Sequence, residues 1–226
     1  MKNIRDGKEQ HRYYGIYEKY FKRVFDCVFA GIAFILFSPL LLLIAILVYI
    51  KLGSPILFVQ ERPGKNEKMF HLYKFRSMSN ARDQNGNLLS DTERLTRFGR
   101  ILRSTSLDEL PELYNILKGE MSLVGPRPLM KQYLPYYTKK ERHRHDVRPG
   151  LSGLAQIHGR NALGWEERFQ YDLQYVNHIT FWMDIKIIFL TIQKVIKRDH
   201  IGVRGEGALM DFDRYRKQQN DEKGRD

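Results

Sequence analysis

The chain has 226 residues, which is enough for one domain with a hydrophobic core, or for such a domain and an anchor. Its net charge of +12 favours anionic partners, such as nucleic acid, an anionic membrane surface or phosphorylated substrates. The single cysteine, Cys27, excludes an intramolecular disulfide and suits a reducing compartment. The mean hydropathy of −0.48 is typical of a soluble protein, but it conceals one strongly apolar segment.

The first predicted elements are a polar N-terminal arm over residues 1–20 and an apolar membrane helix over residues 21–50. A straight helix over the uncharged part would reach ~36 Å, enough to cross a ~30 Å hydrocarbon core. Pro39 lacks an amide N–H and clashes with the preceding turn, so the helix must kink or break at Ser38-Pro39. The Ser38 hydroxyl is placed to bond one of the backbone groups that the break frees.

Basic residues flank this apolar segment on both sides. Residues 1–26 hold seven Lys and Arg, and residues 51–82 hold seven more. Cytoplasmic flanks of membrane segments are the basic ones, and a re-entrant hairpin leaves both flanks in the cytoplasm. A kinked spanning helix would carry one flank across the membrane. The residues alone leave both arrangements open.

Residues 51–203 form the predicted main domain. Two strands over 55–60 and 69–75 enclose a turn rich in Pro, Gly and Asn, which predicts a β-hairpin. Helical patterns follow at 92–103, 107–117, 131–145, 165–178 and 183–198, and loops are predicted at 83–92, 119–128 and 147–153. The helix at 183–198 is amphipathic and basic, which suits either a membrane surface or core packing. Residues 204–226 are charged and poor in apolar residues, and we predict a disordered tail.

Asp108 and Glu109 are the strongest candidates for chemistry. Pro111 fits a helix only in its first turn, so a helix must begin near 107–110 and place both carboxylates at its positive end. Thr105, Ser106 or Asp108 could cap it. Ordinary helix capping is, from these residues alone, the simpler explanation for acidic residues at such a position.

Several basic residues could accompany these carboxylates. Lys74 ends the second predicted strand, Arg103 precedes the acidic pair, and prolines on both sides restrict Arg127 in the GPRP loop. Arg160 lies in another loop, HGRN. Arginine binds phosphate oxygens through two parallel hydrogen bonds, so the set suits a phosphorylated substrate, although a solvated basic face has the same composition.

Other sequence signals are weaker. His143 and His145 could ligate a metal, but a basic helix face also explains them. The sequence contains no GxGxxG, Walker A, GxSxG or zinc-type Cys/His pattern.

The chain resembles the bacterial polyprenyl-phosphate phosphoglycosyl transferases, which belong to the monotopic superfamily of bacterial sugar transferases. The resemblance covers about residues 20–200 and is closest to the small, minimal members. It rests on KRVFD (22–26), Ser38-Pro39, QERPGKN (60–66), LYKFRSM (72–78), RSTSLDELPELYNILKGEMSLVGPRP (103–128), RHDVRPGLSGLAQIHGRN (144–161) and WEERFQYDLQYV (165–176).

The resemblance implies a fold that is mainly α with a small β-hairpin, a re-entrant helix-break-helix anchor at Ser38-Pro39, and a catalytic domain on the cytoplasmic face of the bacterial inner membrane. It implies transfer of a sugar-1-phosphate from a UDP-sugar to undecaprenyl phosphate, with release of UMP. Residues 144–176 favour an acetamido sugar over galactose or glucose. The oligomeric state is open, and a homo-oligomer is one option.

The resemblance also implies roles for individual residues. Asp108 would form a covalent phosphosugar intermediate, and Glu109 would assist the second step or help Asp108 to bind Mg²⁺. Lys74, Arg103 and Arg127 would bind phosphate, and Arg160 would contact the nucleotide. Two other hypotheses are a non-catalytic scaffold that binds anionic lipid and a nucleic-acid binder. The apolar segment argues against nucleic acid as a partner.

Overall fold

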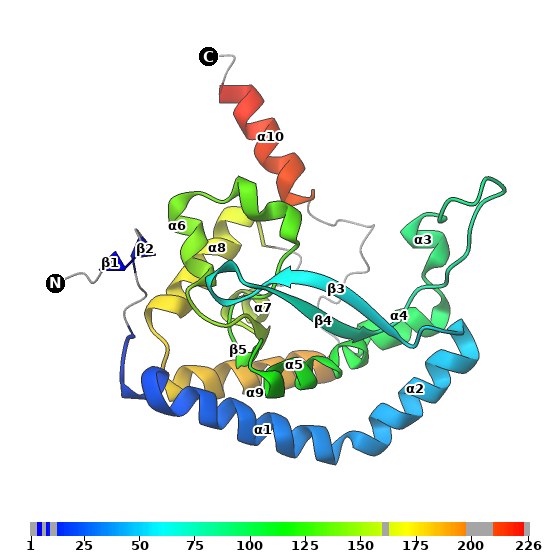
Figure 1. Ribbon diagram of the computed structural model, residues 1–226, viewed down its shortest axis with the longest axis horizontal. Coiled ribbons are helices and arrows are strands. Elements are labelled where there is room, and N and C mark those ends of the chain that lie inside the picture. Colours follow the sequence, from blue (N-terminus) through cyan, green and yellow to red (C-terminus); the bar gives the residue numbers. More distant parts are fainter. Residues whose placement is uncertain (1–3, 6–7, 10–12, 160–162, 198–209, 224–226) are drawn as a thin grey trace.

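The computed structural model describes residues 4–5, 8–9, 13–159, 163–197 and 210–223. Two long apolar helices, α1 (Lys22–Leu36) and α2 (Ser38–Leu52), form one edge of the molecule, and most of the remaining elements lie to one side of them (Figure 1). A short strand pair, β1 (Ile4–Arg5) and β2 (Lys8–Glu9), and a π-helical turn, η1 (Tyr17–Phe21), precede α1. The predicted helix over 21–50 therefore begins at Lys22, and the turn η1 before it lies almost wholly within the predicted arm over residues 1–20.

The predicted break at Ser38-Pro39 is confirmed. The Ser38 hydroxyl donates to the Ile35 carbonyl oxygen at 2.7 Å, which is the acceptor that Pro39 leaves without its helical partner. No single helix within the described residues is long and apolar enough to cross a membrane, whereas Tyr17–Leu36 and Ser38–Leu52 together meet that criterion, with a 61° bend between them. The sequence at the break therefore sets the direction in which the chain turns.

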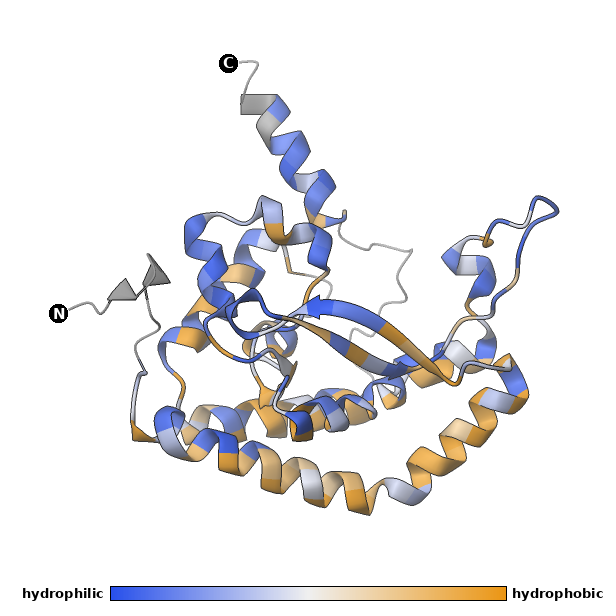
Figure 2. Cartoon of the chain, viewed as in Figure 1, coloured by the Kyte–Doolittle hydropathy of each residue, from blue (hydrophilic) through white to orange (hydrophobic). Residues whose placement is uncertain are grey.

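Both halves of this bent pair consist mainly of hydrophobic residues (Figure 2). Ile35 is 75% exposed and Leu42 64% exposed, and α2 buries only Ile44 and Val48 fully. Contiguous exposed apolar surface of this kind marks a membrane or protein interface. The exposed faces of α1 and α2 are therefore suited to contact with a nonpolar environment outside the protein.

The predicted β-hairpin is also confirmed. Strand β3 (Leu57–Pro63) pairs antiparallel with β4 (Met69–Phe75), in a register that places Leu57 opposite Phe75. Strand β3 begins two residues later than the predicted 55–60 and ends three residues later, because the turn is confined to residues 64–68. Phe70 and Leu72 of β4 pack against α1 and α5, which orients this strand toward the centre of the molecule.

The remaining elements are mostly short. They are the 3-10 turns η2 (Lys65–Glu67), η3 (Leu107–Glu109), η4 (Lys131–Tyr136) and η5 (His143–His145), the helices α3 (Asp91–Arg94), α4 (Arg97–Ser104), α5 (Glu112–Lys118), α6 (Lys139–Arg142), α7 (Leu154–His158), α8 (Trp165–Asn177), α9 (Phe181–Lys197) and α10 (Phe212–Lys223), and the strands β5 (Ser122–Val124) and β6 (Gly150–Ser152). The single helix predicted at 131–145 is wrong: Pro135 lies inside η4, and this stretch is three short turns.

The loops predicted at 119–128 and 147–153 each contain a strand instead. Strands β5 and β6 pair in parallel, with Ser122 opposite Gly150. A side chain on Gly150 would place its Cβ 2.1 Å from the Gly125 nitrogen, so this close approach requires glycine. The pairing brings the loop after β5 beside the loop before β6.

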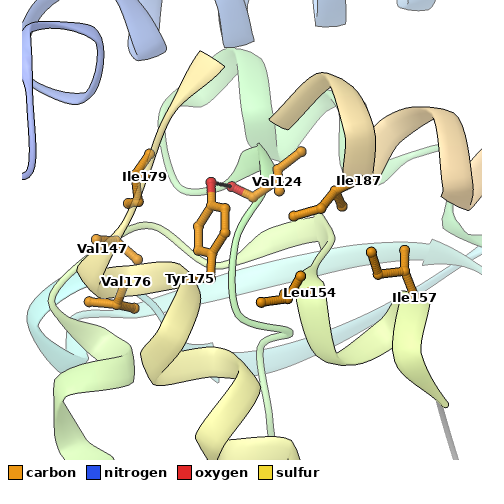
Figure 3. Packing of buried hydrophobic residues seen from close by; sticks show 8 residues of the cluster. All are labelled: Val124, Val147, Leu154, Ile157, Tyr175, Val176, Ile179 and Ile187. Carbon is orange, nitrogen blue, oxygen red and sulfur yellow. Dashed lines mark hydrogen bonds between the residues drawn. The ribbon is translucent and has the colours of Figure 1, made fainter. Parts of the chain in front are cut away.

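Helices α8 and α9 close the core around β5 (Figure 3). The Tyr175 hydroxyl lies 2.9 Å from the Val124 carbonyl oxygen and 2.7 Å from Asp184 Oδ1. Helix α9 packs through Ile187 but leaves Trp182, Phe189, Ile192 and Ile196 exposed. Helix α9 therefore packs on the core with one face and exposes an apolar outer face. Core packing and a place at a membrane surface, the two alternatives for this helix, do not exclude each other.

The prediction of a disordered tail is wrong for residues 212–223, which form α10 on the side away from α1 and α2 (Figure 1). One aromatic anchor explains the difference. Phe212 is completely buried among the rings of Tyr133, Tyr137, Trp165 and Phe169. Arg216 adds ion pairs to Glu141 and Glu166. Average composition cannot reveal a single buried ring of this kind.

Candidate active site

Asp108 and Glu109 lie in the 3-10 turn η3, between the end of β4 and the loop that follows β5. Helix α5 begins at Glu112 with Pro111 as its N-cap, and neither Pro111 nor Ser106 makes a side-chain capping bond. None of the capping arrangements proposed from the sequence is present. Helix capping therefore does not account for the two carboxylates.

Glu109 is the shared counter-ion of two cations. Its Oε1 atom lies 2.6 Å from Lys74 Nζ and 2.5 Å from Arg127 Nη2. Burial alone would raise the pKa of Glu109, but the charges of Arg127 and Lys74 outweigh it and hold that pKa well below its usual range. Glu109 is therefore ionised throughout the physiological range. Its second oxygen, Oε2, accepts no hydrogen bond from the described residues.

Asp108 has a different environment, although it is the adjacent residue. Its side chain is buried, at 8% exposure, and it accepts no hydrogen bond from the described part of the chain. Burial and the neighbouring charge of Glu109 raise the pKa of Asp108 to about 6. A desolvated carboxylate without hydrogen-bond donors is more nucleophilic than one held by donors. We therefore call Glu109, which is held by two cations, the committed carboxylate. We call Asp108, which accepts no hydrogen bond from the described residues, the open carboxylate.

Glu112 is a third acid that sequence reasoning missed. It is 1% exposed, and its Oε1 atom lies 3.1 Å from Lys74 Nζ. Burial, opposed by Lys74 and reinforced by Glu109, raises the pKa of Glu112 to about 7. An acid in the first turn of a helix is common, so the sequence signal is weak. Its spacing of three residues from Glu109 could have indicated a shared face.

Lys74 and Arg103 complete the charged cluster. Burial lowers the pKa of Lys74, but Glu109 and Glu112 together raise it above its ordinary value, so Lys74 stays protonated. Arg103 donates from Nε to Ser77 Oγ at 2.9 Å, and its charge also acts on Asp108. The structure thus brings Lys74, Arg103 and Arg127 around the acidic pair.

Comparison with known proteins shows the family to which the chain belongs. The family model described as "Bacterial sugar transferase" matches residues 17–198, which include both carboxylates and the three cations. The chain belongs to the bacterial sugar transferase family. The resemblance seen in the motifs is therefore confirmed.

Three relatives of this bacterial sugar transferase show how the family varies. An uncharacterised sugar transferase, EpsL of Bacillus subtilis, is 50% identical over 180 residues, which cover 80% of this chain and 89% of EpsL. A UDP-N-acetylgalactosamine-undecaprenyl-phosphate N-acetylgalactosaminephosphotransferase of Aeromonas hydrophila is 39% identical, over 78% of this chain and 44% of that enzyme. An undecaprenyl-phosphate galactose phosphotransferase of Salmonella typhimurium is 37% identical, over 80% and 41%. The chain spans less than half the length of these last two enzymes.

Two other basic residues have different places in the sugar transferase. Arg76 donates to the carbonyl oxygens of Leu52, Gly53 and Ser54, so it joins the chain after β4 to the end of α2. Arg160 lies outside the described residues.

The histidines do not form a metal site in the described part of the chain. His143 bonds Asp146 at 2.8 Å, and His145 is buried against Tyr137, where burial and the charges of Arg144 and Arg142 lower its pKa to about 3. Within the described ranges, no three His, Cys, Asp or Glu side chains are placed to hold a metal ion by themselves.

Proposed function

We propose that this protein transfers a sugar-1-phosphate from a UDP-sugar to undecaprenyl phosphate and releases UMP. The observation that carries this proposal is the contrast between Asp108, an open and desolvated carboxylate, and Glu109, which fixes two cations beside it. Phosphoryl transfer needs a positioned nucleophile and cations that stabilise the charge on the transferred group. The cluster offers both, because Asp108 and Glu109 share one turn of chain and Lys74 and Arg127 reach it from β4 and from the loop after β5.

In the first step, an Asp108 carboxylate oxygen attacks the β-phosphorus of the UDP-sugar. The new oxygen–phosphorus bond forms as the bond from that phosphorus to the bridging oxygen breaks, and UMP leaves with the electron pair. Lys74 and Arg127, which Glu109 holds in place, stabilise the phosphoryl oxygens, and Arg103 adds a third positive charge. The product is an aspartyl phosphosugar.

In the second step, a phosphate oxygen of undecaprenyl phosphate attacks the same phosphorus. The bond to Asp108 breaks, the carboxylate is restored, and the sugar is left on a lipid diphosphate. Glu109 keeps its ion pairs with Lys74 and Arg127 through both steps, so the cations need not reorganise. The sugar-1-phosphate thus moves through two displacements at one phosphorus, instead of a single direct transfer from the UDP-sugar to undecaprenyl phosphate.

Mg²⁺ fits this cluster as a cofactor. Asp108 and Glu109 Oε2 are carboxylate oxygens without protein donors in the described ranges, and Mg²⁺ usually takes one or two carboxylates and completes its shell with substrate phosphates and water. Mg²⁺ would neutralise charge on the diphosphate. Asp108 and Glu109 would hold it.

We further propose that the donor is a UDP-linked N-acetylated amino sugar. The relative from Aeromonas hydrophila is named for N-acetylgalactosamine, and this favours an acetamido sugar. The relative from Salmonella typhimurium is named for galactose, so a UDP-hexose is the competing donor.

The decisive assay supplies detergent-purified protein with undecaprenyl phosphate, Mg²⁺ and one UDP-sugar at a time, and measures UMP. We expect release with UDP-N-acetylated amino sugars and little with UDP-galactose or UDP-glucose. Absence of UMP with every donor would favour the non-catalytic lipid-binding scaffold, and release with a hexose alone would refute the proposed donor.

We also propose that α1 and α2 dip into the cytoplasmic leaflet of the bacterial inner membrane and return, which places the catalytic cluster on the cytoplasmic face. The 61° bend and the exposed apolar faces support this arrangement. Tags at residues 1 and 226 should both resist membrane-impermeant reagents in intact cells. Labelling of the N-terminal tag from outside would indicate a kinked spanning helix instead.

A further inference from the structure

A basic cavity lies at the start of α1, apart from the catalytic carboxylates. It encloses about 260 Å³, and its charged lining consists of the cations Lys19, Lys22, Arg23, Lys65 and Arg148 and the acids Glu18 and Asp26. Five positive and two negative side chains leave three positive charges. A cavity with this balance attracts an anion.

Helix α5 separates the cavity from the active site. Arg23 donates to the Ile116 and Leu117 carbonyl oxygens at 2.6 and 3.0 Å, and Arg148 donates from Nε to the Gly119 oxygen at 2.8 Å. These acceptors lie at the C-terminal end of α5, whereas Glu109 precedes its N-terminal end, roughly 12 Å away along the helix axis. The cavity is therefore not part of the catalytic cluster.

Two of its cations have unused bonding capacity. The guanidinium of Arg148 makes no hydrogen bond within the described residues except through Nε, so both of its terminal nitrogens are without acceptors there. Lys65 has no acceptor or ion pair in the same part of the chain, and its Nζ lies 5.8 Å from the centre of the Tyr13 ring. Burial and the charge of Arg148 lower the pKa of Lys65 by more than Glu18 and Asp146 raise it, while burial and Arg23 lower the pKa of Arg148 by more than Asp26 raises it. Within the described residues, neither cation is in direct ion-pair contact with a carboxylate.

The two acids of the lining are already occupied. Asp26 accepts from Ser122 Oγ at 2.7 Å and from the Leu123 amide at 3.1 Å, and it lies 3.4 Å from Lys22. Glu18 accepts from the Tyr14 amide at 2.7 Å. These acids hold the start of α1 in place, and they act on Lys65 and Arg148 only from a distance, without a direct ion pair.

The surroundings of the cavity indicate a lipid as the source of the anion. Tyr14, Tyr20 and Phe21 are each at least half exposed, and Trp182 is 76% exposed next to Phe181, whose ring packs on Tyr17. Aromatic side chains of this kind gather at the headgroup level of membranes. The uncharged part of α1 begins at Cys27, directly after Asp26 of the lining. The volume is smaller than the ~300 Å³ at which pockets for whole small-molecule ligands begin, so it suits a headgroup.

We propose that this cavity binds the phosphate of an anionic phospholipid headgroup, with Lys65 and the terminal nitrogens of Arg148 as its direct ligands. The inference rests on the proposed membrane anchor but not on the proposed chemistry at Asp108. The bound lipid would hold the start of α1 at the membrane surface and supply the direct anionic contact that the two cations lack.

The test uses the full chain in detergent and dioctanoyl phosphatidylglycerol as the probe, with retained lipid counted by native mass spectrometry. We expect one lipid per chain, with affinity reduced at least about tenfold in Lys65→Gln and retained in Lys65→Arg. Lys51→Gln is the matched control, because Lys51 is an exposed lysine at the other end of the anchor, and we expect a change of less than about twofold.

Two further arms separate the alternatives. Asp108→Asn should keep the lipid, because the cavity lies at the other end of α5, so a loss in that variant would assign the lipid to the active site and overturn the proposal. Inorganic phosphate should compete only weakly, and phosphate that binds as tightly as the lipid would overturn the lipid source. Equal losses in Lys65→Gln and Lys51→Gln would show nonspecific attraction and would also overturn it.

Discussion

Replacing Asp108 with asparagine should abolish UMP release and yet stabilise the folded protein. The amide has the same shape but is a far weaker nucleophile, so we expect the rate to fall at least about 10³-fold. The stability effect has the opposite sign, because burial and Glu109 raise the pKa of Asp108 from 3.8 to about 6. Above pH 6 the folded protein must therefore keep a charge that the unfolded chain holds more easily.

The size of this stabilisation follows from the pKa difference. The native state binds the Asp108 proton more tightly, so its stability falls as the pH rises from about 4 to about 6. A difference of about two pKa units corresponds to at most about 3 kcal/mol, and Asp108→Asn should recover about 1–3 kcal/mol of this at pH 7.5. Thermal or urea unfolding at pH 7.5 and pH 4 measures it, and the gain should nearly vanish at the lower pH.

The same pKa governs the pH dependence of the wild-type reaction. Asp108 must be ionised to attack, so UMP release should decline on the acid side with an apparent pKa of about 6. Asp91→Asn is the matched control, because the Asp91 side chain is 54% exposed and lies in α3. We expect this control to leave activity unchanged and stability within about 0.5 kcal/mol. An Asp108→Asn variant that releases UMP at the wild-type rate would exclude a covalent aspartyl intermediate.

Some of this architecture could be predicted from the sequence, because its signals are local. The break needs only Ser38 and Pro39, and the β-hairpin needs two apolar runs and the turn between them. The pairing of Ser122 with Gly150 could not be predicted, because it joins three-residue strands that lie far apart in the chain and carry no periodicity of their own. Likewise, the ordered tail depends on one ring, Phe212, whose partners lie on other elements.

The candidate site shows the same division. Asp108 and Glu109 could be chosen from the sequence, but two adjacent carboxylates look identical there. Their separate roles depend on Lys74 and Arg127, which reach Glu109 from β4 and from the loop after β5. Glu112 escaped notice because its contact with Lys74 exists only in the folded chain.

Replacing Glu109 with glutamine should impair the same reaction but destabilise the fold, the reverse of the effect expected at Asp108. The glutamine leaves Lys74 and Arg127 without the charge that both of them contact at Oε1. Removing one partner of a buried ion pair costs about 3–5 kcal/mol. The Arg127 side chain is 40% exposed and Glu112 still faces Lys74, so we expect a smaller loss of about 1–3 kcal/mol. The depressed pKa of Glu109 means that its contribution is full above about pH 4.5 and is lost as the pH falls below it.

The kinetic signature of Glu109→Gln should also differ from that of Asp108→Asn. Loss of the Glu109 charge removes one of the causes that raise the pKa of Asp108, so the acid limb of UMP release should move below pH 6 while the maximal rate falls about 10²-fold.

The matched control for this variant is Glu61→Gln. It breaks a Glu–Lys pair of similar length, 2.5 Å to Lys131, in which both side chains are largely exposed. Exposed pairs contribute little to stability, so this variant should keep its stability, its rate and its acid limb. If Glu109→Gln behaved like Glu61→Gln, Glu109 would not be what holds the two cations. If it matched Asp108→Asn in stability as well as in rate, the two carboxylates would be equivalent. Opposite stability changes with a shared loss of rate are the result that assigns the open carboxylate to the nucleophile and the committed one to the cations.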